Sequence, residues 1–198
     1  FTVHVGEYLV LVLFAAAGMM FLVSAEDILM LFVSLELTSL SLYILTAFNK
    51  RDIKSAEAAL KYFLFGGMSA AFMLFGLSLI YGLSGSTNLG EIATFLKGRG
   101  LDPLLVVAIV MTVMGFGFKV AAVPFHLWAP DAYEGAPTPS AAFIASGSKV
   151  ASFFIFAKVM MIGFAGAEGS GAFRYLVSGW VPTIAIVSVL SMGLGNLA

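Results

Sequence analysis

The feature that most constrains this chain is a series of apolar runs, each about 20 residues long. A bilayer hydrocarbon core is roughly 30 Å thick, and a helix of about 20 residues crosses it. Hydrophobic residues make up 61% of the 198 residues, and charged residues only 11%. Too few polar side chains remain to cover the surface of a soluble domain of this size. The sequence therefore predicts an all-α polytopic membrane protein and excludes a soluble globular domain.

Six apolar segments predict about six transmembrane helices. We expect them at 7–23, 28–48, 56–82, 102–131 and 139–162, with a sixth that starts near Phe173 and contains Pro182. The stretch 87–100 is typical of a short amphipathic helix at the membrane interface. Asp27 is well placed to cap the second helix, because its carboxylate can accept the free N–H groups there. Since the chain opens at Phe1 and stops within an apolar run, we expect it to be a piece of a longer chain.

The basic residues predict how the chain is oriented in the membrane. Three of the ten lie in loop 49–55, and short loops rich in Lys and Arg stay on the cytoplasmic side. We therefore expect this loop on the cytoplasmic (or matrix) side and loop 24–27 on the opposite side. Lys97 and Arg99 in the third loop weaken that asymmetry.

The fourth segment is too long for one regular membrane helix. Its 30 residues would extend about 45 Å as an α-helix, and they contain Gly115, Gly117, Lys119, Pro124 and Pro130. Pro124 cannot donate its i→i−4 hydrogen bond, which would free the carbonyl of Val120 beside Lys119. Broken helices with a charge at the break are typical of ion transporters. We expect a broken helix, the alternative being a proline-kinked helix with a snorkelling lysine.

Three charged residues lie deep in apolar segments, where each costs roughly 2.5–3.5 kcal/mol to insert. Glu36 is about nine residues into the second helix, roughly 13 Å from its start. Lys119 lies at the expected break, and Lys149 lies among small residues about eleven positions after Pro139. The structural alternative for Glu36 is a neutral, hydrogen-bonded carboxyl. Intramembrane charges of this kind usually line proton or ion pathways, so we interpret the three as candidate proton-relay residues.

Three further ionisable residues have more open roles. Lys61, near the start of the third segment, can be a snorkelling anchor or a proton relay. His126, seven residues after Lys119, can be a hydrogen-bonding residue or a proton shuttle. Lys158 should reach the far interface, and we interpret it as an anchor.

The composition excludes several other functions. The chain has no cysteine, which excludes iron–sulfur clusters, disulfides and c-type haem attachment, and only two histidines. The net charge of −1 gives no basic surface for nucleic acid. We find no metal-ligand set, nucleophile–base pair or phosphate loop. Carboxylate–lysine pairs control each other's protonation, since approach favours the charged forms and separation the neutral ones. The pattern thus indicates proton movement.

The segment 120–149 carries the most specific motif of the chain. Residues 124–132 (PFHLWAPDA) continue as YEGAPTP and lead to Ser148-Lys149, and further matching stretches are FVSLEL (32–37), KRD (50–52) and EAALKYF (57–63). This pattern resembles the antiporter-like membrane subunits of complex I, the proton-pumping NADH:quinone oxidoreductase, and most of all the N-type subunit. The resemblance covers nearly the whole chain.

The resemblance implies a fold of inverted five-helix repeats. Residues 1–172 would form the first antiporter-like repeat (family helices four to eight), and 173–198 the start of the second (family helix nine). The family's helix-five glutamate falls on Glu36, and its lysines on helices six, seven and eight fall on Lys61, Lys119 and Lys149. His126 lies within the shared motif.

The resemblance also implies the function and surroundings. Quinone reduction elsewhere in the complex would drive proton relay through these residues, and NADH, FMN, iron–sulfur clusters and quinone would be bound by other subunits, with no cofactor or metal on this chain. Its partners would be the other membrane subunits, including sibling antiporter-like subunits, together with lipid, water and protons. The bacterial inner membrane is the expected location, with the mitochondrial inner membrane or thylakoid as alternatives. The competing functions are a subunit of a multisubunit cation/proton antiporter and an inert membrane scaffold.

Overall fold

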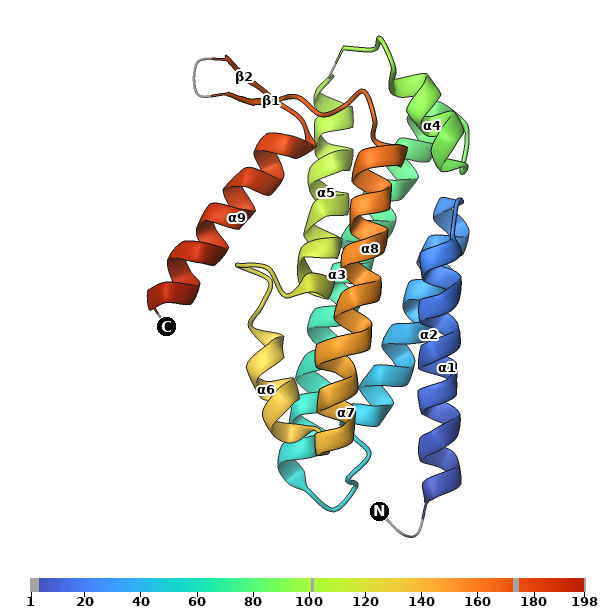
Figure 1. Cartoon of the computed structure of the whole chain (residues 1–198), viewed down its shortest axis with the longest axis vertical. Coiled ribbons are helices and arrows are strands. Elements are labelled where there is room, and N and C mark those ends of the chain that lie inside the picture. The colour runs from blue at the N-terminus through green and yellow to red at the C-terminus, as the bar shows by residue number, and fades with distance from the viewer. Residues whose placement is uncertain (1–3, 101, 173–174, 198) are drawn as a thin grey trace.

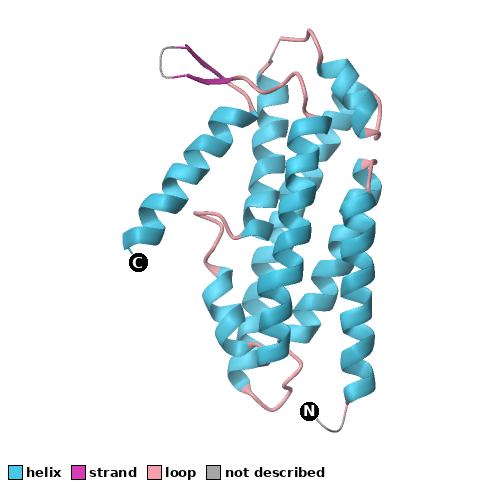
Figure 2. Cartoon of the chain, viewed as in Figure 1, coloured by secondary structure: helices cyan, strands magenta, loops and turns pink. Residues whose placement is uncertain are grey.

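The computed structural model describes residues 4–100, 102–172 and 175–197. Helices make up nearly all of it, with one small strand pair near one end (Figure 2). The α-helices are α1 (Val5–Ser24), α2 (Ile28–Thr46), α3 (Ile53–Ser84), α4 (Leu89–Leu96), α5 (Pro103–Val120), α6 (Trp128–Gly135), α7 (Thr138–Phe143), α8 (Lys149–Lys158) and α9 (Trp180–Leu197). The π-helical turns η1 (Ile144–Ser148) and η2 (Val159–Gly163) flank α8. The strands are β1 (Ser170–Ala172) and β2 (Tyr175–Val177).

Within the described residues, six helices are long and apolar enough to cross a membrane, as the sequence predicts. They are α1, α2, α3, α5, the continuous bent helix Thr138–Gly163 and α9. The first five lie side by side along the long axis, whereas α9 leans away from them (Figure 1). The amphipathic helix expected within 87–100 is α4, which lies at the upper end of the bundle (Figure 1).

The start of the sixth helix differs from its prediction. The predicted start, Phe173, lies outside the described residues, and the helix begins at Trp180. Before it, β1 and β2 form an antiparallel pair in which Ser170 lies opposite Val177. Gly166 and Gly169 take positive φ angles of 96° and 68°, which reverse the chain and favour a turn over a continuous helix. Pro182 then lies in the first turn of α9, where proline is tolerated.

Asp27 caps α2 as predicted, and it also ties two turns together. Its Oδ1 accepts hydrogen bonds from the backbone N–H groups of Leu29 (2.8 Å) and Met30 (3.4 Å). Its Oδ2 accepts a hydrogen bond from the hydroxyl of Thr87, and the backbone N–H of Ile28 donates to the carbonyl of Thr87 at 2.9 Å. The α1–α2 turn is therefore fixed to the turn that precedes α4.

Small residues let the long helices approach closely. A Cβ on Gly18 of α1 would lie 2.5 Å from the hydroxyl oxygen of Thr38 on α2. A Cβ on Gly76 of α3 would lie 2.6 Å from the hydroxyl oxygen of Thr112 on α5. Small residues at helix crossings are the usual packing device inside membranes, where burial against lipid gives no driving force. These crossings fix α2, α3 and α5 around the interior in which the charged residues lie.

Candidate functional site

The fourth apolar segment is broken, as predicted, between α5 and α6. Helix α5 ends at Val120, because Ala121 takes a left-handed conformation with φ 58°, and helical structure resumes at Trp128 (Figure 1). Pro124 lies in the non-helical connection. The hydroxyl of Ser191 on α9 accepts a hydrogen bond from the backbone N–H of Val123 at 3.0 Å. A backbone N–H group at the break thus finds a protein partner, as irregular backbone in a membrane requires.

The sequence predicted that the break frees the carbonyl of Val120. In the structure, two other carbonyls accept hydrogen bonds from side chains at the break. The sequence pointed to Val120, on the assumption that the helix continues up to Pro124. The helix instead ends at Val120 itself. The carbonyl of Phe118 accepts from the indole N–H of Trp128 at 3.0 Å, and the carbonyl of Lys119 accepts from Nζ of Lys149 at 2.9 Å.

Lys119 lies in the interior of the bundle. Only 8% of its surface is exposed. Its Nζ donates a 2.6 Å hydrogen bond to Oγ of Ser39 on α2, and this hydroxyl donates to the carbonyl of Leu35 at 2.5 Å. Nζ also lies 5.4 Å from the ring centroid of Phe118 and 6.0 Å from that of Tyr43. The ammonium is therefore held by a hydroxyl and aromatic rings, and no carboxylate lies within 4 Å of it among the described residues.

Lys149 reaches the same break from α8. It is the first residue of α8, directly after the π-helical turn η1, and it is partly buried. Besides its bond to the carbonyl of Lys119, its Nζ lies over the indole ring of Trp128, 4.4 Å from the centroid. The fold therefore brings together two lysines that are 30 positions apart in the sequence.

Glu36 lies on α2, three residues before Ser39 and hence on the same side of the helix. Its Oε1 is buried and has no hydrogen-bond partner among the described residues. Glu36 is close enough to Lys119 to interact electrostatically, although the two are not in direct contact. The carboxylate can therefore influence the ammonium through its electrostatic field.

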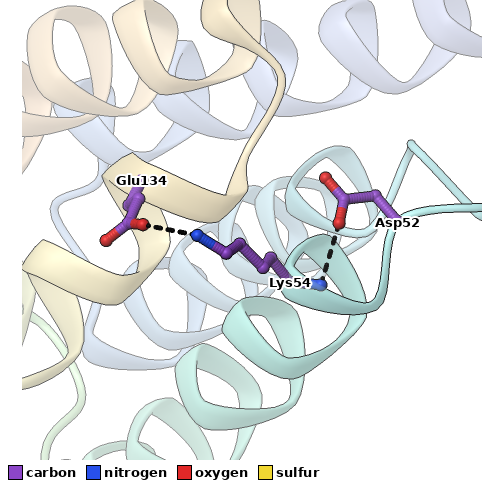
Figure 3. Close-up of polar contacts among 3 residues, drawn as sticks. All are labelled: Asp52, Lys54 and Glu134. Atoms are coloured by element: carbon purple, nitrogen blue, oxygen red, sulfur yellow. Dashed lines mark hydrogen bonds and ion pairs between the residues drawn. The ribbon is translucent and has the colours of Figure 1, made fainter.

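Lys61 lies in a different cluster, between α3 and α6. Its Nζ pairs with Glu57 Oε1 at 2.8 Å and with Asp131 Oδ2 of α6 at 3.1 Å. Nearby, Nζ of Lys54 pairs with Glu134 at 3.1 Å, while the backbone N–H of Lys54 donates to Asp52 (Figure 3). The two lysines and their carboxylate partners Glu57, Asp131 and Glu134 line a small hollow between α3 and α6. The pairs tie the second half of the broken helix to the start of α3.

His126 and Lys158 are the two remaining sequence candidates. His126 is in the break itself, and its Nδ1 is buried without a hydrogen-bond partner in the described part of the chain. Lys158 is the last residue of α8, about 13 Å along the helix from Lys149. Sequence reasoning missed Ser39 and Trp128. The spacing of Ser39 from Glu36 could have indicated the first, whereas the role of Trp128 depends on contacts between helices.

Comparison with known proteins assigns the chain to a family. Residues 25–198 match the family model described as NADH:quinone oxidoreductase/Mrp antiporter, TM. The chain belongs to this NADH:quinone oxidoreductase/Mrp antiporter family. Among the described residues of this family member, no group of three or more His, Asp or Glu side chains could hold a metal ion.

Relatives within the family agree with the resemblance seen in the sequence. The chain is 61% identical over its whole length to NADH-quinone oxidoreductase subunit N 2 of Acidobacterium capsulatum, and covers 40% of that protein. It is 44% identical over 96% of its length to NADH-quinone oxidoreductase subunit N of Desulforamulus reducens, covering 38% of it. The chain thus spans about two fifths of the length of these relatives. The predicted likeness to the N-type subunit and the predicted bacterial integral membrane location are confirmed.

Two solved structures share the fold. The chain aligns with respiratory complex I from Thermus thermophilus at 38% identity and a TM-score of 0.78, covering 96% of this chain and 38% of that one. It aligns with an archaeal respiratory membrane complex, the membrane-bound sulfane sulfur reductase, at 29% identity and a TM-score of 0.81, covering 96% of this chain and 36% of that one. Both share the helical fold of this chain over 96% of its length.

Proposed function

We propose that the chain is part of a proton-translocating membrane subunit of a bacterial NADH:quinone oxidoreductase. Two relatives that match 96–100% of this chain are named as subunit N proteins of that enzyme, and the fold aligns with a complex I structure. In this proposal NADH, FMN, iron–sulfur clusters and quinone are bound by other subunits. The partners of this chain are those subunits, its antiporter-like siblings, water and lipid. The segment 1–172 acts as one helical repeat and 173–198 begins the next.

The observation that carries the proposal is the meeting of two lysines at the helix break. Among the described residues, the direct partners of Lys119 and Lys149 at the break are a hydroxyl, a carbonyl and aromatic rings. Neutral partners leave each amine free to hold or release a proton. In this mechanism Glu36 controls the charge of Lys119, and Lys149 and water pass protons onward. His126 acts as a shuttle within the break.

The energies involved are of the right size. Two unit charges about 6 Å apart interact by about 3 kcal/mol at an effective dielectric constant of about 20. Moving one proton against 100 mV requires about 2.3 kcal/mol. A rearrangement that changes the separation of Glu36 and Lys119 can therefore drive a proton on or off the lysine. Lys61 takes part when its pairs with Glu57 and Asp131 open.

The direct test replaces Glu36 in the full-length subunit of the assembled complex. We expect Glu36→Gln to reduce proton pumping several-fold, because the amide cannot change charge. Pumping is measured as quenching of a pH-sensitive dye in inverted membrane vesicles, with NADH oxidation recorded in the same vesicles. Glu26→Gln is the matched control, because Glu26 lies in the exposed turn between α1 and α2. It should pump normally.

The same preparation separates the competing functions. Normal pumping by Glu36→Gln would contradict the relay and favour an inert scaffold. Sodium-dependent proton flux without NADH oxidation would instead favour a multisubunit cation/proton antiporter. A purified complex that contains the subunit but lacks NADH-oxidising activity would indicate another electron donor.

A further inference from the structure

Trp128 makes a set of contacts that the proton relay above does not use. It is the first residue of α6 and is only 2% exposed. Its indole N–H donates to the carbonyl of Phe118, at the end of the first half of the broken helix. Its ring stacks on Tyr62 of α3, with centroids 4.3 Å apart and planes inclined by 3°. One side chain thus joins both halves of the broken helix to α3.

The same ring also carries a cation. Nζ of Lys149 lies 4.4 Å from its centroid, within the range in which a ring quadrupole attracts an ammonium. Tryptophan gives the strongest attraction of the three aromatic residues, and the attraction grows where water is excluded. The only hydrogen-bond acceptor described for this Nζ is the carbonyl of Lys119. The indole ring and that carbonyl together define where the ammonium lies.

We propose that Trp128 is a positioning residue whose indole ring holds the Lys149 ammonium at the carbonyl of Lys119. This inference rests on the proposed proton relay and adds a residue to it. Trp128 does not exchange protons itself, because its N–H is a donor only. It acts through Lys149, and its bond to Phe118 and its stacking on Tyr62 keep the ring in place. If the ring attracted Lys149 more weakly, Lys149 would spend less time at the break.

A fluorotryptophan series tests the attraction without changing the shape of the side chain. Each added fluorine withdraws electron density from the ring and weakens its attraction for a cation, while the N–H donor remains. We expect protons pumped per NADH oxidised to fall stepwise as fluorines are added at position 128, by about fivefold for the most fluorinated ring. The series is made in the full-length subunit of the assembled complex.

Trp180 provides a matched control. Its indole N–H also donates to a backbone carbonyl, that of Phe164 at 3.2 Å, but no lysine or arginine is found over its ring in the described part of the chain. The same fluorinated residues at position 180 should leave the pumping ratio unchanged. A flat series at position 128, or equal declines at both positions, would overturn the proposed role of Trp128.

Two substitutions separate the ring from its N–H group. Trp128→Phe keeps an aromatic face and loses the donor, whereas Trp128→Leu loses both. We expect pumping to decrease in the order Trp, Phe, Leu, with complex assembly followed on native gels. If Trp128→Leu does not assemble, the fluorinated series decides the question. Equal pumping by the Phe and Leu variants, both assembled, contradicts the role of the ring.

The lysine variants distinguish failure of this inference from failure of the relay. Normal pumping by Lys149→Met overturns both. Loss of pumping in Lys149→Met together with a flat fluorotryptophan series overturns only the role of Trp128.

Discussion

At the scale of single residues, the interior lysines are paired with neutral groups. Lys119 contacts the hydroxyl of Ser39, and Lys149 contacts a carbonyl and an indole ring. By contrast, Lys61 forms ion pairs with two carboxylates at the end of the bundle. A carboxylate in direct contact favours the charged form of a lysine strongly, whereas neutral acceptors favour it less. The interior lysines are therefore better suited to exchanging protons than Lys61 in its paired state.

Ser39 should matter to proton transfer as the acceptor for Lys119. Ser39→Ala removes that acceptor, and a hydrogen bond to a charged group is worth roughly 1.5–3 kcal/mol. We expect pumping per NADH oxidised to fall about tenfold in vesicles from the variant. Ser41→Ala is the control, because Ser41 lies on the same helix and its hydroxyl likewise donates to a backbone carbonyl, that of Leu37. Equal effects of the two substitutions would contradict a specific role for Ser39.

Asp27 contributes to stability in a way that depends on pH. Partial burial raises the pKa of its carboxyl, but hydrogen bonds from Thr87, Leu29 and Met30 outweigh that effect, so the pKa lies below its ordinary value. A carboxyl with a lowered pKa in the folded state stabilises the fold at pH values above its unfolded pKa, near 4. This stabilisation is lost as the pH falls through the lower, folded pKa.

Replacing Asp27 should therefore destabilise the subunit at neutral pH. Asp27→Ala removes the cap of α2, which costs roughly 1–2 kcal/mol, and also the bond from Thr87. We expect a lower thermal unfolding temperature in detergent at pH 7, with the difference from the parent shrinking below pH 4. Glu26→Ala, one residue earlier, should unfold like the parent. A difference that is constant from pH 3 to pH 7 would refute the assignment to Asp27.

At the scale of elements, helix boundaries were predictable where the signal is local. Asp27 marks the start of α2 by capping, and the segment expected from residue 102 begins as a helix at Pro103, because proline suits the first turn. The existence of the break was also predictable from Gly and Pro around Lys119. The residue at which α5 ends was not predictable, because Ala121 takes a left-handed conformation and ends the helix three residues before Pro124. The predicted start of α9 was wrong, because Gly166 and Gly169 turn the chain before the helix begins.

The crossing of α3 and α5 depends on a glycine. A Cβ on Gly76 would lie 2.7 Å from the backbone nitrogen of Thr112 and 2.8 Å from the carbonyl oxygen of Ala108, so the helices would have to separate. We expect Gly76→Ala to cost about 1–3 kcal/mol, seen as a lower unfolding temperature of the full-length subunit. Gly82→Ala on the same helix has no atom within 4 Å of the new Cβ. Gly82→Ala should be neutral or slightly stabilising, and equal losses in both variants would refute this account of the crossing.

At the scale of the whole molecule, the fold brings three sequence candidates to one place. Glu36, Lys119 and Lys149 could be selected from the sequence because charges deep in apolar runs are costly. The atoms that the two lysines contact could not be predicted. The contacts with Ser39 and Trp128 form only because α2, α6 and α8 pack around the break. Lys61 was also selected, yet it lies in a separate charged cluster. Depth in a segment thus predicts a candidate, and tertiary packing decides its partners.

The measurement that tests the central claim most directly is the number of protons moved per NADH oxidised by Lys119→Met in the assembled complex. Methionine fills a similar volume but cannot carry a proton. The account predicts that this ratio falls well below that of the parent, while Lys158→Met, at the far end of α8, keeps the parental ratio. A parental ratio in Lys119→Met would contradict the claim that the lysine at the helix break carries protons.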